Sequence, residues 1–100
     1  MAGASMSIEG DTLRLTGVLD FETVVGLDTQ GREWLQGPAP AQCFIDLAAI
    51  SYCSSVGVAL VLGWLRCAQQ QQKHLNVRHM PADMLALAQV GGLETILSAA

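Results

Sequence analysis

The sequence predicts an α/β fold, a single domain over residues 1–100 with a mixed or mostly parallel sheet and helices packed against it. Residues 12–19 alternate between apolar and polar side chains, which is the period of a strand with one face in the core. Later apolar stretches of strand length are separated by segments of helix length, as crossovers between parallel strands require. With 51% hydrophobic and 14% charged residues, the composition favours a compact core over disorder.

The expected order of elements is β-β-α-β-α-β-α, beginning with a hairpin of Met6–Glu9 and Thr12–Leu19. A helix follows over about Phe21–Gln36, because the Asp20 carboxylate can accept from the free N–H groups of its first turn. A Gly-Pro-Ala-Pro sequence then stops it. Its residues at helical spacing are expected in the core: Val24, Leu27, Trp34 and Leu35, with Gly31 between them.

The second half continues this alternation. Gln42–Leu47 has the length and apolar content of a central strand covered on both faces, with Asp46 held by backbone donors at its end. A helix over Ser55–Gln72 begins buried and ends in a polar glutamine run. Leu75–Arg78 is a short strand, and the last helix spans Ala82–Val90. On that helix one face carries Met84, Leu87 and Ala88, and residues 93–97 add a final turn.

Charge and hydropathy exclude several functions. The net charge of -4 and the scattered basic residues argue against a nucleic-acid partner. The longest uncharged apolar stretch, Val56–Leu65, is about half of the ~20 residues that a spanning helix needs. The N-terminus has no basic region followed by a hydrophobic one. We therefore expect a soluble, cytoplasmic protein without direct membrane insertion.

The residues that could carry chemistry do not form a catalytic or metal-binding set. The 3 cysteines lack CxxC spacing, so we expect Cys43 and Cys67 to be buried free thiols, while the role of Cys53 stays open. His74 and His79 are separated by an odd number of positions and fall on opposite sides of an extended segment. Neither a G-x-S-x-G elbow nor a phosphate-binding Gly-Lys pair is present. We expect no enzyme activity, no cofactor and no metal.

The stretch SYCSSVGVAL, residues 51–60, passes from hydroxyls and a thiol directly into an apolar run. It follows a central strand and opens a buried helix, which is where open α/β folds place their sites. A phosphate attached to Ser55 would meet free N–H groups at the helix start. Ser55 as a plain helix cap is the alternative, and it is compatible with an interface.

Four segments carry a family resemblance: residues 17–20 (GVLD), 44–50 (FIDLAAI), 54–60 (SSVGVAL) and 86–93 (ALAQVGGL). Together they resemble the STAS domain, the fold of anti-sigma factor antagonists and of the small cytoplasmic STAS subunit of the Mla phospholipid-transport ABC complex. The resemblance spans about residues 7–97. It implies a mixed, mostly parallel sheet of about four or five strands with about three or four helices packed against it.

The resemblance also assigns the serines. The usual switch of the family is Asp, then Ser or Thr, a small residue and Gly. With Gly57 as the anchor, Ser54 stands at the Asp position and Ser55 at the position of the functional hydroxyl or phosphoacceptor. In an alternative register Ser54 is the acceptor after Cys53, and Val56 falls on the Gly.

Within the family, the helix start GVALVLGWL is most similar to the Mla subunit. This resemblance implies a non-catalytic accessory subunit, peripheral to the inner membrane through its complex. It would bind and support the cytoplasmic ATPase of an ABC-type transporter that moves phospholipid and maintains outer-membrane lipid asymmetry. The alternative is an anti-sigma factor antagonist regulated by serine phosphorylation. The expected partner interface consists of Asp20, Phe21, Tyr52, Ser54, Ser55 and Val56.

Overall fold

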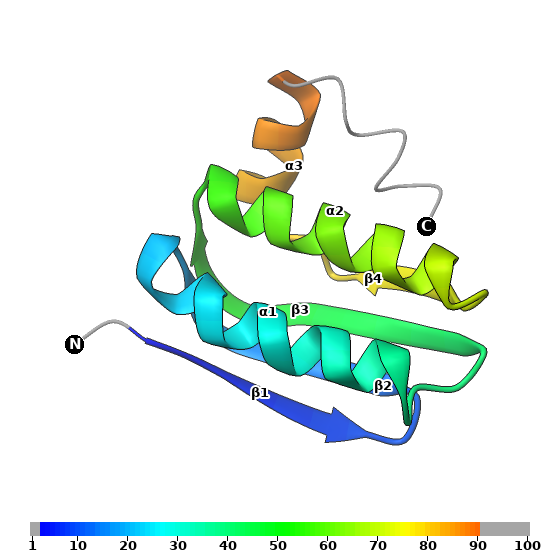
Figure 1. Ribbon diagram of the computed structural model, residues 1–100. Helices are drawn as coiled ribbons and strands as arrows, with labels where there is room; N and C mark the ends of the chain where they lie inside the picture. The colour runs from blue at the N-terminus through cyan, green and yellow to red at the C-terminus, as the bar shows by residue number, and fades with distance from the viewer. Residues whose placement is uncertain (1–2, 91–100) are drawn as a thin grey trace.

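The computed structural model describes residues 3–90, which form a 4-stranded sheet and the helices that pack on it (Figure 1). The elements in chain order are β1 (Ala4–Glu9), β2 (Thr12–Leu19), α1 (Phe21–Gln36), β3 (Gln42–Cys53), α2 (Ser55–Gln70), β4 (His74–Arg78) and α3 (Ala82–Val90). This order confirms the predicted α/β class and sequence of elements. The final turn predicted over residues 93–97 lies outside the described residues.

The sheet has the order β1-β2-β3-β4, with β1 antiparallel to β2 and the other pairs parallel. The parallel pairs follow from the crossovers, since α1 and α2 each return the chain to the same end of the sheet. Figure 1 shows α1 and α2 side by side on one face. The mixed, mostly parallel sheet is therefore confirmed.

The core lies between this helix layer and the sheet. Cys43, Ile45 and Leu47 of β3 point to the helices and are buried, whereas Phe44 and Asp46 between them are only partly covered. The prediction that this strand is covered on both faces is wrong for the described part of the chain, because both crossover helices lie on the same side.

Close packing of α1 against α2 completes the core. The fully buried Trp64 of α2 lies against Gly31, where a Cβ atom would overlap the indole ring. Leu27, Trp34 and Leu35 of α1 are buried as predicted, while Val24 is only partly buried. No helix among residues 3–90 is long and apolar enough to span a membrane.

One predicted placement near the start of α2 is wrong. Tyr52 lies in a strand and not on a loop, because β3 stays paired with β2 as far as Cys53 opposite Leu19. In α3, which packs beside the start of α2 (Figure 1), Met84 is fully buried and Leu87 is 37% exposed. Ala88, predicted on the same face as Met84 and Leu87, lies outside the described side chains.

Candidate functional site

The start of α2 is built by the ends of two strands. Because β3 runs to Cys53 and α2 begins at Ser55, only Ser54 remains between them, as the N-cap residue in an extended conformation. The Ser54 N–H donates to the Leu19 carbonyl oxygen at 2.9 Å, which ties this cap to the end of β2. The alternative that Ser55 is a plain helix cap is therefore wrong: Ser55 is the first helical residue, and it is exposed.

The two long helices begin in different ways. At α1 the Asp20 carboxylate accepts from the N–H groups of Glu22 and Thr23, both at 3.0 Å, and the Thr23 hydroxyl accepts from the Asp20 N–H at 3.0 Å. This capping box confirms the predicted role of Asp20. At α2 the Ser54 hydroxyl caps no N–H group, and its Oγ is buried without a hydrogen-bond partner in the described part of the chain.

Gly57 explains why α2 can begin so close to the sheet. A Cβ atom at this position would lie 2.5 Å from Cys53 Sγ and 3.0 Å from Leu19 Cβ, closer than a side chain tolerates. The Gly57 N–H donates to the Ser54 carbonyl oxygen at 3.0 Å, and the Cys53 thiol donates to the same oxygen at 3.2 Å. Gly57 thus fixes where both serines stand relative to the strands.

Cys53 is a packing residue of this site. Its side chain is 2% exposed, and burial, together with the Asp83 carboxylate, raises the pKa of the thiol to about 11. The thiol is protonated near neutral pH and is therefore a poor nucleophile. Cys43 and Cys67 are buried free thiols as predicted, and burial also raises the pKa of Cys43.

Two open hollows flank the start of α2. The first, of about 470 Å³, lies between the end of β3 and α3 and is lined by Tyr52, Cys53, Ser54, Ser55, Asp83 and Leu87. The second, of about 420 Å³, lies between the first halves of α1 and α2, and its apolar lining consists of Phe21, Val24, Val25, Val56, Ala59 and Leu60. We call the two hollows together the α2-start surface.

Five of the six residues that the sequence predicted as an interface line the α2-start surface, and the sixth, Asp20, lies next to it. Tyr52, Ser54 and Ser55 line the first hollow, Phe21 and Val56 line the second, and Asp20 caps α1 beside Phe21. Sequence reasoning missed Val25, which is 66% exposed. Its signal was available, because Val25 is an apolar residue beside Val24 and lies off the core-facing stripe of α1.

Neither histidine supplies a base to the serines. His74 pairs with Gln42 at the beginning of β3, whereas the serines follow the end of that strand. His79 Nδ1 lies 3.0 Å from the Asp46 carboxylate. The same carboxylate accepts from the Ala48 N–H at 2.9 Å, and this bond, with His79 and Arg14 nearby, lowers the pKa of Asp46. Among residues 3–90, no three potential metal ligands cluster.

Comparison with solved structures places this fold. The anti-sigma factor antagonist SpoIIAA in its unphosphorylated form aligns with a TM-score of 0.72 at 19% identity, over 92% of this chain and 83% of that chain. An anti-sigma factor antagonist from Mycobacterium paratuberculosis aligns with a TM-score of 0.71 at 18% identity, over 96% and 82%. Phosphorylated SpoIIAA of Bacillus aligns with a TM-score of 0.69 at 20% identity, over 92% of this chain and 86% of that chain. The protein is thus an α/β domain with the fold of anti-sigma factor antagonists.

The family follows from the sequence match. A family model described as "Mlab, STAS domain" matches residues 2–98. The chain belongs to this STAS domain family, which confirms the resemblance seen in its motifs. Curated proteins gave no significant match. STAS domains act through contacts with other proteins, which is the role that an exposed apolar surface beside a family motif can serve.

Proposed function

We propose that this chain is a non-catalytic accessory STAS subunit that binds and supports the cytoplasmic ATPase of an ABC-type phospholipid transport complex. The observation that carries the proposal is the α2-start surface, where the family motif and exposed apolar side chains meet. The description of the matching family supports the transport context. In this role the protein sits at the inner membrane through its complex and serves to maintain outer-membrane lipid asymmetry.

The surface has the composition of a docking site. Phe21 is 75% exposed, Val25 66% and Tyr52 51%, although residues of these types are usually buried in a small domain. Aromatic side chains bury a large area with few rotatable bonds and often dominate binding energies. Ser55 is exposed, lines the first hollow and is small, so a partner can approach the helix start closely.

A serine-regulated anti-sigma factor antagonist is the second candidate. The observation in its favour is the exposure of Ser55, because a kinase can reach this hydroxyl while the Ser54 Oγ is buried. The similar fold of a phosphorylated SpoIIAA gives a precedent for phosphorylation of such a domain. In this candidate, phosphate on Ser55 adds nearly two negative charges to the α2-start surface and changes which partner it accepts.

Binding to the ATPase tests the first candidate. The chain is co-purified with the ABC ATPase of the phospholipid transporter, and the ATPase rate is measured with and without it. Phe21→Ala should weaken binding by about tenfold or more, the loss typical of an aromatic anchor. Ser55→Arg should also weaken it, because a bulky cation then fills the contact. Ile8→Ala is the matched control, since Ile8 is 47% exposed but lines neither hollow.

The two candidates give different results. Wild-type binding with a changed ATPase rate supports the transport role, and unaltered binding of both Phe21→Ala and Ser55→Arg rules out the α2-start surface as its interface. Incubation with anti-sigma kinases and ATP, followed by intact mass measurement, addresses the alternative. A gain of one phosphate that Ser55→Ala abolishes would favour the anti-sigma role.

A further inference from the structure

Among the described residues 3–90, strand β1 is at one edge of the sheet and has a row of backbone groups that no other strand pairs. The Val18 N–H donates to the Gly3 carbonyl oxygen at 2.8 Å, so these two residues form a hydrogen-bonded pair of the antiparallel ladder. Hydrogen-bonded and non-bonded pairs alternate along such a ladder. In the register of β1 with β2, the residues that turn their N–H and C=O groups to the free edge are therefore Ala4, Met6 and Ile8.

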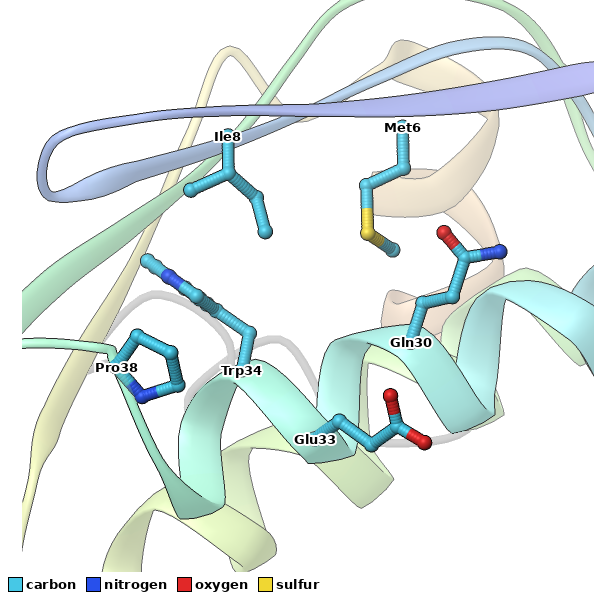
Figure 2. Close-up of a pocket in the computed structure, with 6 residues that line it drawn as sticks. All are labelled: Met6, Ile8, Gln30, Glu33, Trp34 and Pro38. Atoms are coloured by element: carbon cyan, nitrogen blue, oxygen red, sulfur yellow. The ribbon is translucent and has the colours of Figure 1, made fainter.

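The same edge carries an apolar hollow of about 310 Å³. Figure 2 shows Met6 and Ile8 pointing from β1 toward the end of α1, where Trp34 and Pro38 face them. Gln30 and Glu33 form the polar side of the hollow. Apolar side chains and outward backbone groups thus belong to the same residues, so whatever pairs with this edge also covers the hollow.

We propose that β1 pairs antiparallel with β1 of a second copy of this chain, forming a two-fold symmetric dimer with a sheet continuous across both copies. In the register that pairs the most residues, Met6 lies opposite Met6 of the second copy, and Ala4 lies opposite Ile8. These three pairs supply about six backbone hydrogen bonds. Ala4 and Met6 pack toward the core side of the sheet, so Met6 of the second copy enters the mouth of the hollow.

The distribution of charged residues favours pairing of two copies through β1 over pairing through β4. In the proposed register Ser5 lies opposite Ser7, and Glu9 lies opposite Gly3, so no like charges meet. The other edge strand, β4, has the basic residues His74 and Arg78 at its ends, and antiparallel pairing with a second β4 would bring them together. Charged residues on an edge strand discourage such pairing. Residues 4–8 of β1 carry no charge.

The size of the edge sets the strength of the dimer. The Cα atoms extend over 31 × 30 × 19 Å, so an edge face has an area on the order of 600 Å² per copy. Specific, stable interfaces bury roughly 800 Å² per partner, and smaller ones are typical of weak, reversible association. The dimer is therefore dependent on concentration, and it forms on a face separate from the α2-start surface.

Sedimentation velocity of the full chain from micromolar to millimolar concentration tests the proposal. The wild type should shift from monomer to dimer. Met6→Lys and Met6→Glu should each weaken self-association by at least about tenfold, because like charges then oppose each other at the two-fold axis. An equimolar mixture of the two variants should dimerise again, which also shows that both are folded.

Val25→Lys is the matched control, because Val25 is an exposed apolar residue on the α2-start surface. It should self-associate like the wild type. A wild type that stays monomeric at every concentration overturns the proposal. So does a dimer that Val25→Lys abolishes and Met6→Lys does not, since its interface would then be the α2-start surface.

Discussion

The contrast between the two helix starts gives the sharpest prediction about the candidate site. Ser54 and Asp20 occupy the same position, the N-cap, of α2 and α1. The Asp20 carboxylate accepts two backbone N–H groups, whereas the Ser54 hydroxyl accepts none and is buried. Replacing each residue by alanine should therefore change the free energy of unfolding differently, although serine and aspartate at an N-cap stabilise helices by similar amounts on average.

The magnitudes follow from these bonds. Asp20→Ala removes a working cap and should lower the free energy of unfolding by about 1–2 kcal/mol. Ser54→Ala removes a buried hydroxyl that has no partner, and such a group costs about 1–3 kcal/mol to bury. Alanine has no capping atom, but the Ser54 hydroxyl makes no capping bond that could be lost. We therefore expect Ser54→Ala to leave the free energy of unfolding unchanged or to raise it by up to about 1 kcal/mol.

Urea unfolding followed by circular dichroism measures both variants. A domain of this size changes its melting temperature by about 4–8 °C per kcal/mol, so thermal melts separate the two outcomes as well. Ser55→Ala serves as the control, since Ser55 is exposed and should change stability little. A loss of about 1 kcal/mol or more in Ser54→Ala would refute the reasoning, because it would mean that the hydroxyl caps α2 in solution.

Three further predictions concern the neighbourhood of the site and the open face. Gly57→Ala should destabilise by about 1–3 kcal/mol in urea unfolding, because its Cβ meets Cys53 Sγ and Leu19 Cβ, and Cys53→Ala should recover part of the loss. Cys53 is buried and protonated, so it should resist alkylation by iodoacetamide until the chain unfolds. Because folding raises the pKa of this thiol from 9.0 to about 11, the free energy of unfolding should fall as the pH rises between these two values. The pKa of Asp46 is lowered in the folded state, so its carboxylate stabilises the fold at pH values above its unfolded pKa, near 3.8. This stability is lost as the pH falls through the folded pKa. Asp46→Asn should therefore make the free energy of unfolding less dependent on pH in this acidic range, as urea unfolding at a series of pH values measures.

Local sequence patterns predicted the fold well, because most of its helices and strands have a recognisable signal within a few residues, such as an alternation of apolar side chains or a helix cap. The alternation of residues 12–19 and the Asp20 cap placed β2 and the start of α1 correctly. The end of β3 escaped prediction, because residues 48–53 are held in the strand by pairing with β2, a contact distant in sequence. The sequence of β3 also could not show that only one of its faces is covered by helices among the described residues, since this depends on the side of the sheet on which α1 and α2 pack.

For the candidate site, the sequence motif selected residues that lie close together in the structure, but it did not assign their roles. Gly57 fixed the register of the serines in the sequence motif, and its steric reason appears in the contacts with Cys53 and Leu19. The motif could not say which hydroxyl is reachable, because Ser54 and Ser55 differ only through the direction in which the helix begins. Val25 is different, since its position off the core-facing stripe of α1 was readable in the sequence, whereas the hollow that it lines needs α2 beside α1.

The two proposed surfaces can act at the same time because they lie at opposite ends of α1. Phe21 begins this helix at the α2-start surface, and Trp34 lies near its end beside β1. At 1.5 Å per residue these two side chains are separated by about 20 Å along the helix axis. Pairing through β1 therefore leaves the α2-start surface of each copy free. A dimer should bind two partners, and Met6→Lys should lower this stoichiometry of the assembly without weakening the individual contact.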